Sequence, residues 1–153
     1  MVARINYARL GYKADELTGL LQDFPVKVAR NDHWEQGQST SLRVGMLNIP
    51  AEIRSACLVL ADQPFVSVDT YRALAARQLA LPEKIIVPTY RGESGNPTMF
   101  PQITFEELRS QSTADSGGRR LLKKYDTDLL ETNDPYVIRD IDTVEDFRKY
   151  TEN

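Results

Sequence analysis

The chain has 153 residues, 41% of them hydrophobic and 27% charged, and its 19 basic and 22 acidic side chains give a formal net charge of −3. This length suits one domain with one core, which we expect to span residues 1–153. The negative balance disfavours a nucleic-acid partner, and no apolar run reaches the roughly 20 residues of a membrane span. The first residues show no secretory signal, so we expect a cytoplasmic protein.

The chain has one cysteine, Cys57, and one histidine, His33. An internal disulfide is therefore excluded, and the apolar run around Cys57 predicts a buried core residue rather than a reactive thiol. Sites built from several histidines are also excluded. Hard cations bound by oxygen ligands are the favoured metal chemistry.

Strands and helices alternate along the chain. The first ten residues predict a ragged strand, and further strands are predicted at residues 26–29, 57–60, 85–87, 98–100, 129–131 and 137–139. Helices are predicted before Pro25, from Ser41, from Asp69, from Thr104, after Gly118 and from Thr143. Ser39 or Ser41 is expected to cap the second helix. The alternation predicts an α/β fold with helices on both sides of a mostly parallel sheet.

The most apolar strand, at residues 57–60, leads directly to Asp62 and Pro64. Its unbroken apolar character predicts a buried parallel strand, and ligands of such sheets bind just beyond the carboxyl ends of the strands. Asp62 at this end is either a ligand of a divalent cation or the cap of the following turn. These residues alone leave both interpretations open.

Four polar loops follow or flank strands, and a parallel sheet can bring them into one crevice: residues 31–41, 62–64, 91–97 and 140–143. The loop from Gly37 to Ser41 offers a glycine, hydroxyl groups and a helix start, which suit a nucleotide, but an ordinary capped helix has the same residues. Asp142 is equally explained as a turn residue before the Thr143 cap. Arg119 suits an anionic group, although arginines on a solvated helix face are common.

Seven motifs occur in an order that chance rarely supplies: LGYKADEL at 10–17, NDHWEQGQSTSLR at 31–43, LADQP at 60–64, PTYRG at 88–92, GNP at 95–97, DSGGR at 115–119 and RDIDTVED at 139–146. Together they resemble the molybdenum cofactor cytidylyltransferases of the molybdopterin nucleotidyltransferase family. The resemblance implies a three-layer, nucleotide-diphospho-sugar-transferase-like fold of the Rossmann-like type. It also implies transfer of CMP from CTP to molybdopterin with Mg²⁺ and release of pyrophosphate.

The resemblance also assigns roles to residues. Asp62 and Asp142 would be catalytic as ligands of the metal. The nucleotide would be bound by Asn31, Gly37, Gln38, Ser39, Ser41 and Leu42. The pterin substrate would be bound by Arg91, Gly95, Asn96, Pro97 and Arg119.

One part of the family pattern is missing. Members begin with a central strand and a glycine-rich loop that binds the triphosphate, and nothing in this chain matches them, so the domain is expected to be N-terminally truncated. The alternative function is therefore a non-catalytic remnant or accessory protein, which binds nucleotide weakly or serves a molybdenum hydroxylase client. For the unpaired neighbours of the absent strand we expect that residues 2–10 fill the gap, that the neighbours pair with each other, or, as the favoured outcome, that a homodimer covers the edge.

Overall fold

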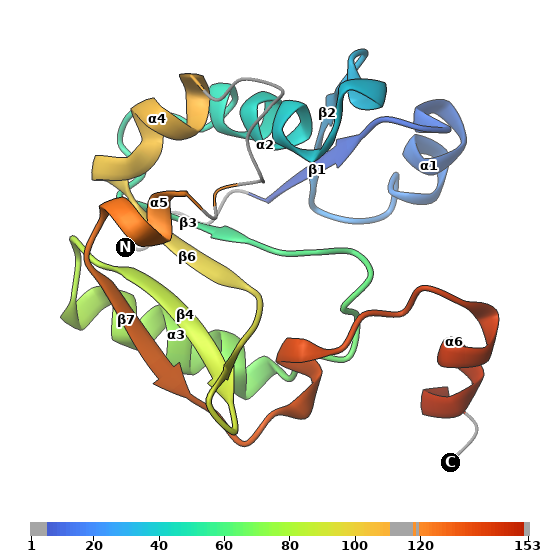
Figure 1. Cartoon of the computed structure of the whole chain (residues 1–153). Helices are drawn as coiled ribbons and strands as arrows, with labels where there is room; N and C mark the ends of the chain where they lie inside the picture. Colours follow the sequence, from blue (N-terminus) through green and yellow to red (C-terminus); the bar gives the residue numbers. More distant parts are fainter. Residues whose placement is uncertain (1–5, 111–117, 119, 152–153) are drawn as a thin grey trace. The chain divides into compact units, whose positions relative to one another are not determined.

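The computed structural model describes residues 6–110, 118 and 120–151, and the chain divides into two compact units (Figure 1). Unit 1 comprises Met1–Ile53 and Ile103–Lys124, and unit 2 comprises Arg54–Gln102 and Tyr125–Asn153. The single domain over residues 1–153 stays a prediction. In the described part of the chain, no helix is both long and apolar enough to cross a bilayer.

Unit 1 is a two-stranded parallel sheet with helices packed against it. Its elements are β1 (Tyr7–Leu10), α1 (Ala14–Leu20), β2 (Lys27–Arg30), the 3-10 helix η1 (Trp34–Gln36), α2 (Gln38–Leu47), α4 (Phe105–Ser110) and α5 (Leu121–Lys124). Helix α2 packs against both strands and against α4. Arg109 of α4 donates to the carbonyl oxygens of Met46 and Ile49 at 3.1 and 3.3 Å, which places a cation at the C-terminal end of α2, where the helix dipole favours it.

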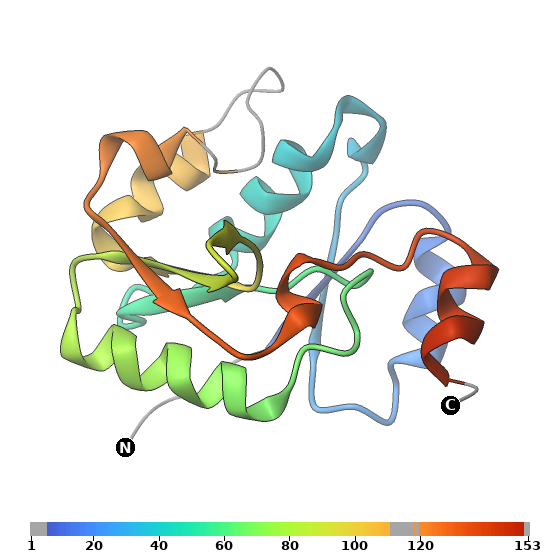
Figure 2. The same cartoon turned by 60° about the horizontal axis from the view of Figure 1, so that its bottom comes forward.

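Unit 2 contains a five-stranded sheet with α3 along it (Figure 2). Its elements are β3 (Ser55–Leu58), α3 (Val68–Ala80), β4 (Ile85–Tyr90), β5 (Glu93–Ser94), β6 (Thr98–Pro101), β7 (Thr127–Glu131), the 3-10 helix η3 (Pro135–Ile138) and α6 (Val144–Thr151). The 3-10 helix η2 (Gln102–Thr104) follows β6. Buried Leu74 of α3 packs with Ile86 and Met99 of the sheet to form the core of this unit.

The five-stranded sheet is mixed, because β6 lies antiparallel between β3 and β4, whereas β7 is parallel to β4. Strands β3, β4 and β7 therefore point the same way. The turn at Arg91 and Gly92 reverses the chain immediately after β4, so β5 and β6 each run antiparallel to β4. The mixed α/β fold class is confirmed, with this antiparallel strand added to the predicted parallel order.

The expectation of a buried parallel strand at residues 57–60 is wrong. Strand β3 is only half-buried, pairs with β6 alone among the described strands, and is antiparallel to it. Cys57 is exposed rather than in the core, and Val59 is 45% exposed. The reason is that β3 lies at the edge of its sheet, where a run of apolar residues does not imply cover on both faces.

The predicted strand at residues 137–139 is wrong as well, because η3 occupies residues 135–138. Pro135 stands at the first position of this 3-10 helix, and Asp134 caps it by accepting a hydrogen bond from the backbone of Tyr136. The final helix agrees with its predicted capping box: the Asp146 backbone donates to the Thr143 hydroxyl, and the Thr143 backbone donates to the Asp146 carboxylate.

The described part of the N-terminal segment does not fill a gap in the five-stranded sheet. Residues 7–10 form β1, which pairs with β2 in the two-stranded sheet of unit 1. No ladder among the described strands joins β1 to β3. Among the described strands, residues 7–10 therefore do not fill the expected gap, and β1 and β3 do not pair with each other.

Candidate functional site

Three of the four predicted polar loops meet in unit 2, at the carbonyl oxygen of Val137 in η3. The side-chain amide of Gln63 donates to this oxygen at 3.4 Å, and the backbone N–H of Asn96 donates to it at 2.8 Å. The loop after β3, the loop before β6 and the segment after η3 are therefore held together. We call this arrangement, residues 62–64, 95–97 and 137–142, the loop cluster.

Two further hydrogen bonds in the loop cluster bring the segments of Asp62 and Asp142 side by side. The backbone N–H of Ile141 donates to the Asp62 carbonyl oxygen at 2.7 Å, and Gln63 donates to Asp140 Oδ1 at 2.7 Å. Asp62 and Asp142 are both exposed, while Gln63 between the two segments is buried. Two segments that each carry an exposed aspartate therefore lie side by side in unit 2.

The donor set of this region fits a magnesium ion. Mg²⁺ in nucleotide enzymes is commonly held by one or two carboxylates, with phosphate oxygens and waters completing the shell. That Asp62 and Asp142 supply these carboxylates stays a prediction. Within residues 6–110, 118 and 120–151 no group of three or more His, Cys, Asp or Glu side chains is arranged to hold a metal by itself, so an ion here needs oxygens from a substrate or water.

Asp134 connects η3 of the loop cluster to the start of α3. Its buried carboxylate accepts hydrogen bonds from the Ser67 backbone at 2.8 Å, the Thr70 hydroxyl at 2.7 Å and the Tyr136 backbone at 3.0 Å. Burial alone would raise the pKa of Asp134, but these hydrogen bonds outweigh it and hold the pKa below its usual range. The residue connects the start of α3 to η3. In the sequence Asp134 precedes Pro135, but this pattern did not predict its role in connecting α3 to η3.

Gly95 is required by the close packing of the loop cluster. A Cβ atom at this position would lie 2.0 Å from the Val137 carbonyl oxygen. The Gly95 backbone N–H donates to the Pro88 carbonyl oxygen at 2.9 Å, which fixes the loop against β4. Of the other predicted substrate residues here, Asn96 is half-buried and Pro97 is buried.

Arg91 lies at the tip of the β4–β5 hairpin, exposed, with its guanidinium group 5.2 Å from the centroid of the Tyr90 ring. Glu131 of β7 holds the base of the hairpin by accepting hydrogen bonds from the Thr89 hydroxyl and from the Arg91 backbone. The hydrogen bond from Thr89, followed by those from the backbone of Arg91 and Gly92, lowers the pKa of Glu131. Sequence patterns did not reveal Glu131, because its partners lie on another strand.

The fourth predicted loop lies in unit 1 and is organised by Asn31. The fully buried side-chain amide of Asn31 donates to the hydroxyls of Thr40 and Ser41, each at 2.9 Å, and accepts from the His33 backbone at 3.0 Å. The end of β2 is thereby joined to the start of α2. Asn31 uses its whole amide within the protein, which makes it a residue that positions this loop.

Helix α2 begins earlier than predicted, and neither Ser39 nor Ser41 is its cap. The N-cap is Gly37, whose φ of 107° favours glycine, and the helix starts at Gln38. Thr40 stabilises this start because its hydroxyl donates to the Gly37 carbonyl oxygen at 2.8 Å. Among the predicted nucleotide residues, Gln38 is exposed and Leu42 is in the core. Ser39 is buried, and its hydroxyl has no hydrogen-bond partner in the described structure.

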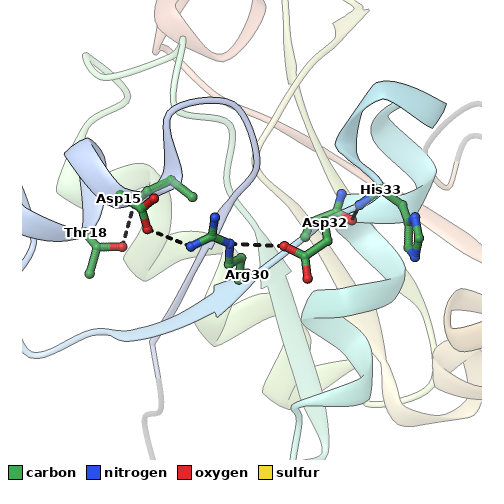
Figure 3. Close-up of polar contacts among 7 residues, drawn as sticks. Asp15, Thr18, Arg30, Asp32 and His33 are labelled. Carbon is green, nitrogen blue, oxygen red and sulfur yellow. Dashed lines mark hydrogen bonds and ion pairs between the residues drawn. The ribbon is translucent and has the colours of Figure 1, made fainter.

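Arg30 fixes the strand that leads into this loop. Its guanidinium group lies between Asp15, at 2.6 Å, and Asp32, at 3.0 Å (Figure 3). The hydrogen bond from Arg30 to Asp15 is the main cause that raises the pKa of Arg30. Arg119 and the turn at residues 115–117, which were predicted to bind the substrate or an anion, lie outside the described residues.

The sequence matches known proteins over most of its length. A model of the MobA-like NTP transferase domain matches residues 8–129. Purine catabolism protein PucB of Bacillus subtilis (strain 168) is 34% identical over 119 residues, which are 74% of this chain and 55% of that protein. The chain therefore spans about half the length of this curated relative.

Solved structures share the fold. Rv0371c from Mycobacterium tuberculosis H37Rv superposes with a TM-score of 0.78 at 25% identity, over 99% of this chain and 78% of that one. A second structure of Rv0371c is a complex with manganese. Molybdopterin-guanine dinucleotide biosynthesis protein A from Archaeoglobus fulgidus matches with a TM-score of 0.57 at 12% identity, over 94% of this chain and 67% of that one, which supports the fold alone.

The family match covers the Asn31 loop, Asp62 and the Gly95 loop, whereas Asp142 lies beyond its last residue. The association of Asp142 with the site therefore rests on the hydrogen bond between Ile141 and Asp62. With most of the chain matched, this protein belongs to the MobA-like NTP transferase domain family.

Proposed function

We propose that this protein transfers a CMP group from CTP to the terminal phosphate of molybdopterin. An oxygen of that phosphate attacks the α-phosphorus of CTP. The new P–O bond forms as the bond from the α-phosphorus to the oxygen bridging to the β-phosphate breaks, and pyrophosphate leaves with the electron pair. Nucleotidyl transfer follows from the family, and CTP and molybdopterin follow from the resemblance to cytidylyltransferases.

The single observation that carries this proposal is the joining of the Asp62 and Asp142 segments in unit 2. We assign both carboxylates to one Mg²⁺ ion, which would neutralise phosphate charge that builds up during the transfer. A relative with a similar fold is known as a manganese complex, which supports a divalent ion in this family. The manganese belongs to that protein, and the assignment to Asp62 and Asp142 is ours.

In unit 1 we assign the nucleotide to the start of α2. Exposed Gln38 and the backbone of Gly37 would contact the base and ribose, whereas the hydroxyl of Ser39 is buried and would reach them only after the start of α2 rearranges. Asn31 and Leu42 would support this site without contacting the nucleotide, because Asn31 positions Thr40 and Ser41 and Leu42 packs in the core. In unit 2 we assign the pterin to Arg91 and the loop of Gly95, Asn96 and Pro97, and Arg119 completes this set.

The test is transfer of label from α-phosphate-labelled CTP to molybdopterin in the presence of Mg²⁺, with labelled GTP as the comparison. The proposal predicts a labelled pterin dinucleotide and stoichiometric pyrophosphate, with CTP preferred over GTP. Preference for GTP would instead indicate that the protein transfers a GMP group. Metal-dependent binding of CTP without any transfer would favour the alternative, an accessory protein that binds nucleotide and assists the maturation of molybdenum enzymes. Transfer only to other small phosphorylated acceptors would support nucleotidyl transfer but exclude molybdopterin as the acceptor.

A further inference from the structure

Three half-buried aromatic side chains of unit 2, those of Phe65, Tyr136 and Tyr150, pack against one another. The ring centroids lie 5.6 Å apart for Phe65 and Tyr136, 5.8 Å for Phe65 and Tyr150, and 5.5 Å for Tyr136 and Tyr150. These separations, with tilted or edge-on rings, are those of favourable aromatic pairs. We call these three rings the aromatic cluster.

Each ring of the aromatic cluster comes from a different segment of the chain. Phe65 directly follows residues 62–64 of the loop cluster, Tyr136 lies in η3, and Tyr150 lies in α6. The guanidinium group of Arg139 lies 5.7 Å from the centroid of the Tyr136 ring and 5.9 Å from that of Tyr150, within the range of a cation–π contact. The aromatic cluster therefore joins the segments that meet in the loop cluster and adds α6 to them.

The backbone at Asp142 is held on both sides. Before it, the backbone N–H of Ile141 donates to the Asp62 carbonyl oxygen at 2.7 Å. After it, the capping box starts α6: the Thr143 hydroxyl donates to the Asp146 carboxylate at 2.7 Å and accepts from the Asp146 backbone at 3.0 Å. A contact that fixes the position of α6 therefore also restrains the backbone at Asp142.

We propose that Tyr150 is a positioning residue for Asp142. Its ring, packed against Phe65 and Tyr136, holds α6 in place. The capped start of α6 in turn holds Asp142 beside the segment of Asp62. The consequence for a metal rests on the proposed function, which assigns the Asp62 and Asp142 carboxylates to one Mg²⁺ ion, whereas the restraint on the backbone does not.

Amide hydrogen exchange of the 153-residue chain, followed by NMR, tests the restraint directly. In Tyr150→Ala the amide of Ile141, which donates to Asp62, should exchange about tenfold faster or more, because two aromatic pairs are lost. Exchange of the Ile86 amide in the core should stay unchanged. Tyr150→Phe keeps the ring and should behave as wild type. Wild-type exchange of Ile141 in Tyr150→Ala, or equal acceleration at Ile86, would overturn the proposal.

Phe147→Ala is the matched control. Phe147 lies on the same helix, is 52% exposed and makes no ring contact with the described residues, so its removal should leave the exchange of Ile141 unchanged. The same acceleration in Phe147→Ala as in Tyr150→Ala would overturn the proposal, because any weakening of α6 would then suffice.

Calorimetric titration of CTP separates the role of Tyr150 from the proposed function. Tyr150→Ala should bind CTP as wild type does without Mg²⁺ and should lose about tenfold of the gain in affinity that the metal adds, and Tyr150→Phe should retain that gain. An unchanged gain in Tyr150→Ala would overturn the role of Tyr150 at the site. If wild type gains nothing from Mg²⁺ while the Ile141 amide still responds to Tyr150→Ala, the restraint is supported and the metal assignment of the proposed function fails.

Discussion

The backbone N–H of Ile141 donates to the carbonyl oxygen of Asp62 at 2.7 Å, although 79 positions separate the two residues in the sequence. Asp142 follows immediately, so the hydrogen bond joins two segments that lie far apart along the chain and each carry an aspartate. Gln63 strengthens the same connection through Asp140. The site proposed for the metal therefore depends on backbone and amide contacts as much as on the carboxylates.

Gln63→Leu should weaken this connection. Removal of the amide takes away the 2.7 Å hydrogen bond to Asp140 and the weaker one to Val137, with an expected loss of about 1 to 3 kcal/mol in the free energy of unfolding. It should also weaken metal-dependent binding of CTP, because the Ile141–Asp62 backbone hydrogen bond would then hold the two segments without the support of Gln63. Urea unfolding and calorimetric titration measure the two effects.

Gln78→Leu is the matched control. Gln78 is also buried, and its amide also donates twice, to the carbonyl oxygens of Leu81 and Lys84. It should lower stability by a similar amount and leave metal-dependent binding unchanged. Equal effects of the two substitutions on binding would show that Gln63 contributes only to stability.

Asp134 should make unfolding pH-dependent. Its pKa is lowered in the folded state, so its contribution is fully present above the ordinary aspartate pKa of about 4 and is lost as the pH falls through the lowered value. Asp134→Asn should therefore be destabilising at neutral pH, by about 1 to 3 kcal/mol, and the difference from wild type should shrink in acid. Asp69→Asn, an exposed neighbour on α3, should show little effect. A difference that stays constant down to strong acid would contradict this account.

Gly95→Ala should distort the loop cluster. The added Cβ would lie 2.0 Å from the Val137 carbonyl oxygen, so η3 or the loop must move, with an expected loss of about 1 to 3 kcal/mol. Gly19→Ala is the control, because nothing lies within 4 Å of a Cβ there and alanine favours a helix by roughly 0.5 to 1 kcal/mol. Thermal unfolding should show opposite signs for the two variants. An unchanged melting temperature for Gly95→Ala would contradict the close packing.

Asn31→Ala should loosen the start of α2. The substitution removes both hydrogen bonds to Thr40 and Ser41 and leaves the His33 backbone without its acceptor, with an expected loss of about 2 kcal/mol. Weaker binding of CTP should accompany it if α2 bears the nucleotide. Asn48→Ala, at the exposed end of the same helix, removes one hydrogen bond to Val44 and should change stability little and binding not at all. Equal affinity of both variants for CTP would contradict the assignment of the nucleotide to the start of α2.

The sequence was sufficient for the class of fold and for the loops of unit 2. The order of apolar strands and capped helices predicted the α/β fold, and the motifs at residues 60–64, 95–97 and 139–146 identified segments that the structure joins at Val137. Local chemistry also predicted the Thr143 capping box correctly.

What failed depended on tertiary neighbours. The apolar run at residues 57–60 predicted burial, but β3 is exposed because of its place at the sheet edge. Ser39 and Ser41 had the right chemistry for a cap, but the amide of Asn31 binds Ser41 and Thr40, and Gly37 takes the cap position. The supporting carboxylates of Asp134 and Glu131 accept hydrogen bonds from residues 40 to 67 positions away, which no local pattern reveals.

The most direct test of the proposed site is calorimetric titration of CTP into the protein with and without Mg²⁺, repeated for Asp62→Asn, Asp142→Asn and the control Asp69→Asn. Wild type and the control should bind CTP more tightly with the metal. Asp62→Asn and Asp142→Asn should lose this gain, by about tenfold or more in affinity, since each 1.4 kcal/mol of lost interaction is a factor of ten. Binding of CTP by Asp62→Asn with the same metal dependence as wild type would contradict the assignment of the metal to these two carboxylates.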